Sequence, residues 1–355
     1  MIDSNLAGGT KTQSAMQVEH AQAQLFVRAI QTGGYGVAIS TVGKAGGDRI
    51  TVASGKVQEW LNGPITSLGD SPKRSMHLPI EEVPPSIWQS DPEKWATPED
   101  FQGDEQTRVQ AAFNSGKQAV MFTKFGYSYK DPVSIPASVV LVDLMQQNSR
   151  AGNLEITEAS DKPLVILHPG NRVTLNIRAP RTVIVRYGDL GWSVITEKPT
   201  TVHILGITNT GPKPRACPPN VKVYARSINN ENKGEPNFPV AGGMMWVLGF
   251  KTEGSAEAFA VRDGGVLEVL GGYRNQCGDD KDKPMILNDD SNVSFVGFSN
   301  MAKIFPQAIW ETRKGETKKI TKDDLPKRPA YAGTYFVPLY SGYDPAKVTK
   351  VSGRR

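Results

Sequence analysis

Residues 95–129 read WATPEDFQGDEQTRVQAAFNSGKQAVMFTKFGYSY and combine a capped helix, a strand and a turn in a short space. Asp104 stands at an N-cap position, where its carboxylate can accept the free backbone N–H groups of the first helical turn. Gly116 supplies the left-handed residue that ends a helix, and the apolar run 119–122 follows as a strand. The helix face expected to be buried consists of Val109, Ala112 and Phe113. The stretch predicts a short helix that leads directly into the first strand of a β domain.

Apolar runs recur beyond residue 135 with a rough period. They centre on Val140, Val165, Ile184, His203, Lys222, Trp246, Leu267 and Ser294. The spacings from residue 184 onward are 19, 19, 24, 21 and 27 residues. Turn-forming pairs such as Gly188-Asp189, Asn229-Asn230 and Gly264-Gly265 follow the same rhythm. A period near twenty with insertions of variable length is typical of stacked coils, in which each coil contacts only its neighbours.

An antiparallel β-sandwich is the main alternative for this many strands. Its tight hairpins favour Asn-Gly or Asp-Gly pairs between strands of equal length. Beyond residue 135 this signal occurs only weakly, at Asp263-Gly264. The solenoid is therefore the preferred interpretation.

The stretch 95–129 resembles the opening segment of the pectate-lyase superfamily of right-handed β-helices, whose pattern has the form DFG..DDT.AIQ.AIDSGK..V.FP.G.Y. The matching residues are Asp100, Phe101, Gly103, Asp104, Gln110, Ala111, Ala112, Ser115, Gly116, Lys117, Val120, Phe122, Gly126 and Tyr129. The chain departs from the pattern at Glu105, Gln106 and Thr123. Within the superfamily, it is most similar to the second β-helix half of glycoside hydrolase family 55, over residues 88–300 in overall pattern. This resemblance implies an all-β fold, a single-stranded right-handed parallel β-helix with a short N-terminal capping helix.

The chain divides into four predicted segments. Residues 1–80 alternate as β strands without a helix of their own, so they are either the closing turns of a preceding β-helix or a small separate β domain. Residues 81–95 form a linker with Pro and Trp, which the tryptophans are expected to anchor. Residues 96–302 form the β-helix, and residues 303–355 form a C-terminal strap and polar tail. Within that last segment, Lys314–Lys327 is expected to be a charged loop, and residues 346–355 to fray.

Composition narrows the classes of function. The chain has 355 residues, a formal charge of +5 and a pI near 9.0, but its basic residues are not interleaved with aromatics as in a nucleic-acid groove. Four His and two Cys lack metal-ligand spacing, so neither a zinc site nor another cofactor is expected. Cys217 and Cys277 form either a disulfide or two free thiols.

No membrane or targeting segment is predicted. The chain has no apolar stretch near the 18 residues that a spanning helix needs, and Met1–Ser14 lacks the apolar region of a signal peptide. The resemblance places the chain after an upstream β-helix half in a longer, extracellular or secreted protein.

Most candidate site residues lie within residues 242–273. Strand alternation with Trp246, Leu248 and Phe250 inside would direct Lys251 and Glu253 outward. The same argument with Leu267 and Val269 inside would direct Glu268 outward. Because neighbouring coils lie ~4.8 Å apart, carboxylates one or two coils apart cover the separations used by glycosidases. The candidate catalytic residues are Glu253, Asp263 and Glu268, and the candidate substrate-binding residues are Lys251, Arg262, Trp192 and Tyr273.

Structural interpretations of the same residues compete with the catalytic one. Glu253 can pair with Lys251 or Arg262, and Glu268 with Arg274, as an ion ladder along the stack. Trp192 follows Gly191 in a predicted turn and is the best candidate for an exposed ring that stacks on a sugar. His203 lies within a strand, where a packed, hydrogen-bonded imidazole is more typical than a catalytic base.

Function follows only from the resemblance. Members of family 55 hydrolyse β-1,3-glucan, which implies a polysaccharide or oligosaccharide ligand and a glycoside hydrolase rather than a polysaccharide lyase. A non-catalytic carbohydrate-binding or structural β-helix, such as a surface or tail-fibre module, is the alternative, since a fold alone does not establish an activity.

Overall fold

The computed structural model describes residues 1–21, 23–43, 48–85, 88–124, 126–145, 152–170, 173–209, 216–231, 234–277, 282–300, 306–327 and 334–352. The chain forms two compact units. The first unit comprises Met1–Thr66 with Pro338–Tyr340, and the second comprises Ser67–Val337 with Ser341–Arg355.

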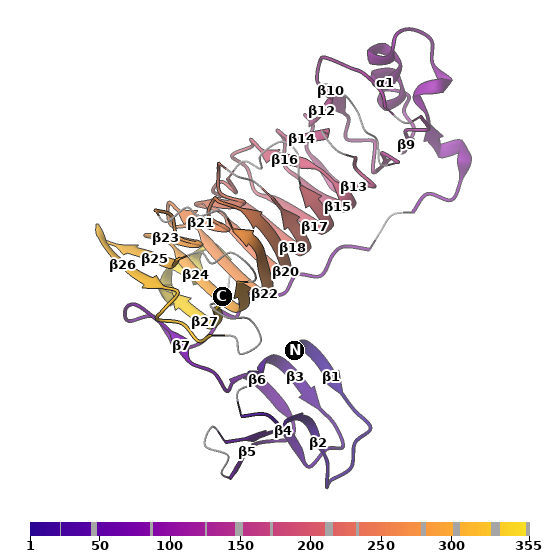
Figure 1. Cartoon of the computed structure of the whole chain (residues 1–355). Helices are drawn as coiled ribbons and strands as arrows, with labels where there is room; N and C mark the ends of the chain where they lie inside the picture. The colour runs from indigo at the N-terminus through magenta and orange to yellow at the C-terminus, as the bar shows by residue number, and fades with distance from the viewer. Residues whose placement is uncertain are drawn as a thin grey trace. The chain divides into compact units, whose positions relative to one another are not determined.

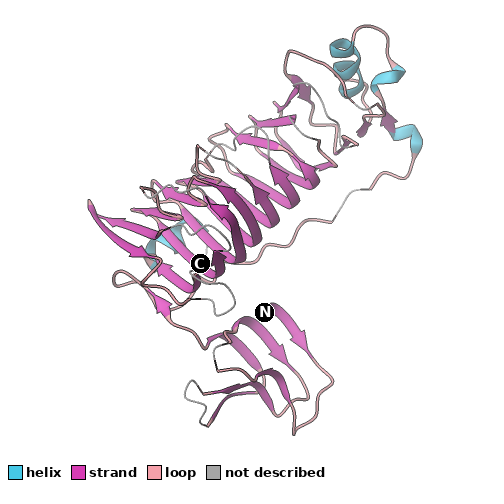
Figure 2. Ribbon diagram, in the orientation of Figure 1, coloured by secondary structure: helices cyan, strands magenta, loops and turns pink. Residues whose placement is uncertain are grey.

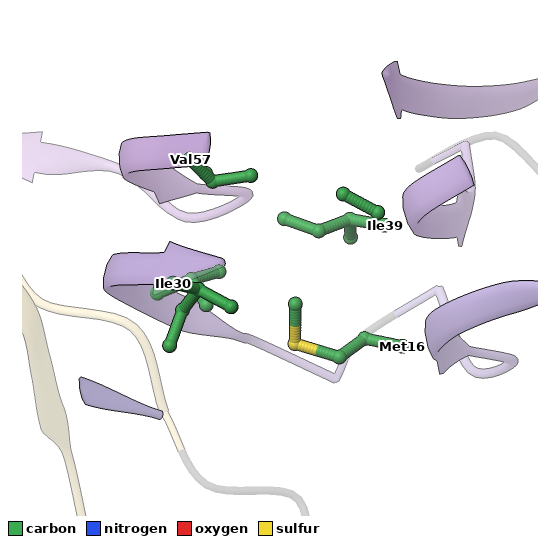
Figure 3. Packing of buried hydrophobic residues seen from close by; sticks show 6 residues of the cluster. Met16, Ile30, Ile39 and Val57 are labelled. Atoms are coloured by element: carbon green, nitrogen blue, oxygen red, sulfur yellow. The ribbon is translucent and has the colours of Figure 1, made fainter. Parts of the chain in front are cut away.

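Among its described residues up to Thr66, the first unit contains seven short strands. These are β1 (Ile2–Leu6), β2 (Ser14–Val18), β3 (Phe26–Thr32), β4 (Val37–Val42), β5 (Arg49–Ala53), β6 (Lys56–Leu61) and β7 (Ile65–Thr66). β1 pairs with β3 and β2 with β4 in parallel, as successive coils do, whereas β6 and β5 close the two sheets antiparallel. Met16, Ile30, Ile39 and Val57 meet in the core between the sheets (Figure 3). The assignment to closing turns or to a small β domain stays a prediction.

The second unit begins with short elements and continues as long and short strands in alternation. Its first elements are η1 (Pro92–Lys94), β8 (Trp95–Ala96), η2 (Pro98–Asp100), α1 (Glu105–Phe113), β9 (Ala119–Met121), β10 (Val133–Ile135), β11 (Leu141–Asp143) and β12 (Gly152–Ile156). The middle of the unit contains β13 (Ser160–Leu167), β14 (Val173–Ile177), β15 (Arg181–Asp189), β16 (Gly191–Val194), β17 (Thr200–Asn209), β18 (Val221–Asn230), β19 (Phe238–Ala241) and β20 (Met244–Gly254). The last elements are β21 (Phe259–Arg262), β22 (Val266–Cys277), β23 (Ile286–Asp289), β24 (Asn292–Asn300), β25 (Gln307–Arg313), β26 (Glu316–Thr321), β27 (Phe336–Gly342) and α2 (Pro345–Ser352).

These strands form a parallel β-helix, as predicted. Along the large sheet the order runs β24-β22-β20-β18-β17-β15-β13-β11-β9-β8, and every neighbouring pair is parallel (Figures 1 and 2). The shorter strands stack in two further sheets, β10-β12-β14-β16 and β19-β21-β23-β25-β26. The parallel pairing expected one coil apart is confirmed near Ile204 and Lys222, where Ile204 pairs with Ala225 and Lys222 with Thr201. Asp263-Gly264 is a left-handed turn between strands of different sheets and makes no hairpin.

The core consists of apolar columns that run along the stack. One column, with each residue aligned with the next, is Val183, Val202, Val223, Met245, Leu267 and Val293. A second is Val185, Ile204, Ala225, Val247, Val269 and Phe295. The ring of Phe295 packs against Phe259 of β21 with centroids 5.4 Å apart, so this column faces the opposite sheet. Alternation therefore follows the prediction at Leu267 and Val269, but Trp246 lies in an outward-facing column.

The long strands bend at one aligned position in each coil, where the backbone is left-handed. The residues there are His168, Tyr187, Gly206, Ser227, Gly249, Gly271 and Gly297, with φ between 46° and 85°. We call this set the bend column. Each follows one member of an aligned series that runs from Leu167 to Val296. A left-handed backbone costs ~1–2 kcal/mol for a residue with a side chain, which explains the glycine at four of the seven positions.

An extended segment, Met76–Val83, covers an outward-facing column of the large sheet. Its Leu78 N–H donates to Glu268, and Val83 packs on the cluster that contains Ile184. The predicted anchoring by both tryptophans is wrong for Trp88, whose surface is 64% exposed and which contacts only the edge of Trp95 among the described rings. Because this segment follows the stack for several coils, it shields strand faces that alternation predicted to be open.

The N-terminal end of the β-helix is only partly as predicted. Asp104 caps α1 by accepting from the Thr107 N–H at 2.8 Å, and Val109, Ala112 and Phe113 are fully buried. The helix packs against η2 and β10. However, the edge of β9 is paired with β8, so a strand and not the predicted helix covers this edge.

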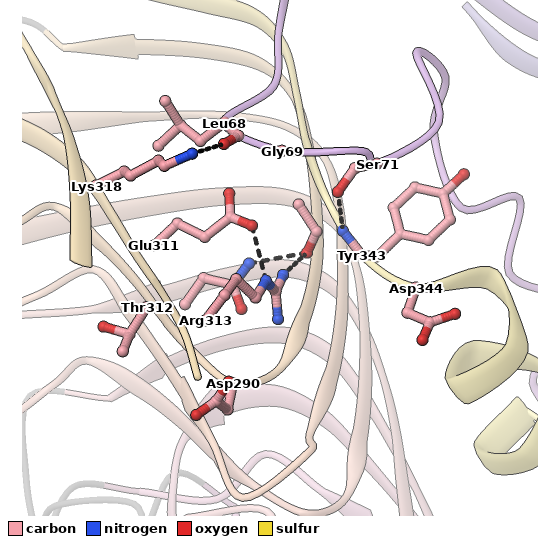
Figure 4. A network of polar contacts seen from close by, with 12 residues as sticks. Leu68, Gly69, Ser71, Asp290, Glu311, Thr312, Arg313, Lys318, Tyr343 and Asp344 are labelled. Atoms are coloured by element: carbon pink, nitrogen blue, oxygen red, sulfur yellow. Dashed lines mark hydrogen bonds and ion pairs between the residues drawn. The ribbon is translucent and has the colours of Figure 1, made fainter. Parts of the chain in front are cut away.

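The C-terminal end continues further than predicted. β25 extends the parallel stack beyond residue 302, and β26 forms where a loop was expected. The segment from residue 346, which was expected to fray, forms most of α2. Figure 4 shows how this end is held: Arg313 binds the Glu311 carboxylate at 2.8 Å and the backbone oxygen of Gly342 at 2.8 Å, and Lys318 binds that of Leu68 at 3.2 Å.

We predict that Phe113→Ala lowers the free energy of unfolding by about 3–5 kcal/mol, because it removes a fully buried ring that packs 6.1 Å from Phe122. Urea unfolding followed by circular dichroism measures the change. A loss under about 1 kcal/mol would show that α1 contributes little to the core.

Two adjacent glycines, both with positive φ, differ in the space that an added side chain would find. At Gly271, φ is 85° and no atom lies within 4 Å of an added Cβ, so Gly271→Ala should cost about 1–2 kcal/mol. At Gly272, φ is 155° and an added Cβ would also lie 2.1 Å from the Phe250 ring, so strain and clash together should make Gly272→Ala cost about 3 kcal/mol or more. Equal urea midpoints for the two variants would contradict this account.

Candidate functional site

A group of polar side chains surrounds one lysine on β18, β20 and β22. Lys251 Nζ lies 2.6 Å from Glu253 Oε1 and also contacts Glu231 Oε1. The amide of Asn229 donates to Glu231 at 2.8 Å, and that of Asn275 donates to Glu253 at 3.4 Å. We call these five residues the lysine cluster.

The stacking of coils places an exposed ring beside this cluster. Asn229, Lys251 and Tyr273 are aligned on three successive strands, each two residues after a bend-column position. Aligned residues of neighbouring parallel strands lie ~4.8 Å apart. Tyr273 is 41% exposed, whereas most large apolar side chains of this unit are buried. The cluster therefore offers an aromatic ring, amides and charges on one stretch of surface.

The charges of the cluster are held by hydrogen bonds. Partial burial lowers the pKa of Lys251, but its hydrogen bonds to Glu231 and Glu253 outweigh this effect and raise the pKa above its usual value. The hydrogen bonds from Lys251 and Asn229 lower the pKa of Glu231. Lys251 and Glu231 therefore stay charged at neutral pH, a state that suits hydrogen bonding to hydroxyl groups more than proton donation.

The structure places the predicted site residues in different surroundings. Glu253 is half-buried and paired with Lys251, as the ion-ladder interpretation predicts. Arg262 and Asp263 are exposed at the corner between β21 and β22. Glu253 lies near the end of β20, before the chain reaches β21. The structure thus brings Glu253, Lys251 and Tyr273 together and leaves Asp263 and Arg262 on another corner.

The predicted exposure of Glu268 is wrong. Its side chain faces away from the core, as alternation predicts, but it is fully buried under the segment Met76–Val83. Glu268 Oε2 accepts from the Leu78 N–H at 3.0 Å, and Oε1 accepts from Ser294 Oγ at 3.3 Å. A carboxylate in this position ties the covering segment to the stack, because its removal would leave a buried N–H without its acceptor.

Two aromatic predictions also need correction. Trp192 is only 8% exposed, because it lies in β16 and pairs with Leu175 of β14 inside the stack. His203 is packed as predicted, stacked on Tyr224 with ring centroids 5.4 Å apart. However, neither of its ring nitrogens has a hydrogen-bond partner among the described residues, and burial lowers its pKa.

Cys217 is a buried free thiol, so it forms no disulfide with Cys277, whose side chain lies outside the described residues. Burial raises the pKa of Cys217 to about 12. The described residues include no group of three or more His, Cys, Asp or Glu side chains placed to hold a metal ion. Among the helices of the same described ranges, none is long and apolar enough to cross a membrane.

A pocket of about 430 Å³ lies elsewhere on the β-helix. It is lined by residues at the starts of β18 and β20, including Asn220, Lys222 and Gly243, whereas Lys251 lies near the end of β20. None of the predicted site residues lines this pocket.

Comparison with known proteins adds no family. No protein-family model matches the chain, and no curated protein matches it. The likeness to family 55 therefore remains a resemblance of sequence pattern.

The lysine cluster predicts a specific pH dependence. Because the pKa of Glu231 is lowered in the folded state, its stabilisation is present above its ordinary pKa of ~4.3 and is lost as the pH falls through the folded value. Lys251→Met removes the main cause, so its unfolding midpoint in urea should fall less between about pH 5 and pH 3 than that of the unchanged protein. Lys222→Met, near the start of β18, serves as the control. Equal falls in Lys251→Met and the unchanged protein would contradict the prediction.

Proposed function

We propose that this chain is a non-catalytic, carbohydrate-binding β-helix whose ligand contacts Tyr273 and the lysine cluster. The observation that carries the proposal is the exposed Tyr273 ring aligned with Lys251 on the neighbouring strand. A sugar presents C–H groups on its faces and hydroxyl groups at its edges. An amphipathic tyrosine fits the first, and the amides, carboxylates and ammonium group of the cluster fit the second. The extracellular setting implied by the resemblance is part of this proposal.

Two observations favour binding over catalysis. Glycoside hydrolysis needs one carboxylic acid that holds a proton and one ionised carboxylate. Glu231 has a lowered pKa and is bound by Lys251, and Glu268 is covered by the segment Met76–Val83. Both arrangements stabilise the fold and leave these groups unsuited to proton donation.

A hydrolase remains the second candidate because Glu231 and Glu253 approach the same Lys251 Nζ from neighbouring coils. In that case Glu253 is the proposed acid. Release of reducing sugar from β-1,3-glucan, pectin or alginate, abolished by Glu253→Gln, would establish it. If no reducing sugar is released but the protein binds one of these polysaccharides, the result supports the binding module.

We predict that Tyr273→Ala weakens binding about 3- to 10-fold for whichever of these polysaccharides the unchanged protein binds. This factor corresponds to the ~0.5–1.5 kcal/mol of an aromatic contact. Affinity electrophoresis in gels that contain each polysaccharide measures the effect. Trp88→Ala is the control, because Trp88 is also exposed but lies outside the β-helix strands. Equal retention of Tyr273→Ala and the unchanged protein would rule out Tyr273 as a contact.

A further inference from the structure

We propose that Asp143, His168 and Tyr187 form a second saccharide-binding anchor, so that the ligand is a linear oligosaccharide lying along the axis of the β-helix. The inference rests on the proposed function and deepens it. It concerns coils that precede the lysine cluster in the stack and residues that the cluster does not use.

The first observation is an oriented imidazole. Asp143 is buried, and its Oδ1 accepts from the Met145 N–H at 3.0 Å and lies 3.1 Å from His168 Nδ1. The His168 side chain is 41% exposed. When Nδ1 donates to a buried carboxylate, the ring is fixed and Nε2 is presented to a ligand. A ring nitrogen held in this way suits the hydroxyl group of a sugar, which can both donate and accept a hydrogen bond.

The second observation is an exposed ring on the next coil. Tyr187 follows His168 in the bend column, and its surface is 57% exposed. The next position is Gly206, where an added Cβ would lie 3.2 Å from the Tyr187 ring. The ring therefore leans along the stack over a residue without a side chain, in the direction of the lysine cluster, and lies one coil from the imidazole.

The third observation is backbone conformation. His168 and Tyr187 have φ of 46° and 58°, at positions where four other coils use glycine. A left-handed backbone with a side chain is unfavourable and often marks a functional position. Ser227 is the third bend position with a side chain, but its hydroxyl is small, so His168 and Tyr187 are the two large side chains held in this unfavourable backbone.

The fourth observation is the polar surface between the two anchors. Asp189, Thr208, Asn229, Lys251 and Tyr273 are aligned on successive strands of the large sheet. Four steps of ~4.8 Å separate the first from the last, a span of about 19 Å. One compact sugar cannot reach both tyrosines, whereas a linear chain laid across the coils contacts both and the polar residues between them.

The test uses glycine substitutions, because glycine fits the bend column. Tyr187→Gly removes a ring and relieves the backbone, so this variant should unfold at a urea concentration no lower than the unchanged protein. His168→Gly also relieves the backbone but removes a partner of the buried Asp143 carboxylate, so its folded state is checked by circular dichroism before the titration. Ser227→Gly is the matched control: it makes the same backbone change at an exposed position that carries no anchor. Isothermal titration calorimetry measures the affinity for oligosaccharides of increasing length, prepared from the polysaccharide that the unchanged protein binds.

We expect affinity to rise at least 10-fold once the oligosaccharide is long enough to span both anchors, since the second contact becomes intramolecular. His168→Gly and Tyr187→Gly should abolish this rise, and Ser227→Gly should preserve it. If the protein binds oligosaccharides and Tyr273→Ala weakens binding, but Tyr187→Gly leaves the rise intact, the second anchor is wrong and the proposed function stands. If no saccharide binds the unchanged protein, both are wrong.

Discussion

Parallel pairing of each strand with the next at one fixed register is the constraint on which the rest of this structure depends. Because aligned residues repeat every ~4.8 Å, each position of a coil becomes a column, and every column must be compatible with its own neighbours. Apolar columns such as Val185 to Phe295 fill the interior. The bend column needs a left-handed backbone at every level. Polar columns expose Asn229, Lys251 and Tyr273 together.

The same constraint explains which features the sequence predicts. The helix signals around Asp104 and the recurring apolar runs are local, and they give the fold class, the helix bounds and the parallel coils. Register is harder, because the centres of two neighbouring apolar runs, His203 and Lys222, do not pair with each other: His203 pairs with Tyr224. The period therefore fixes which coils are neighbours but not which residues pair.

The candidate site shows which contacts local sequence patterns do not predict. Alternation gives the correct side of the strand for Glu268, but its burial comes from Leu78, 190 residues away. Trp192 follows a glycine that looks like a turn, yet its strand is paired within the stack. The pair of Lys251 with Glu253 is local, and the ion-ladder interpretation of the sequence predicts it. Glu231 follows β18 and contacts Lys251 from a neighbouring coil. Contacts between coils require the register, which the sequence alone leaves open.

The last strand of the stack affects how copies of this protein meet one another. β25 ends the parallel series, and its open edge would be a template for another chain. After Lys314 and Gly315, both left-handed, the chain turns back as β26 and pairs antiparallel with β25. The outer strand carries exposed Lys318 and Lys319, whose charges disfavour the approach of a further strand. The antiparallel β26 and its exposed lysines thus end the sheet. They disfavour the pairing of a second copy at this edge, and so limit the growth of end-to-end filaments.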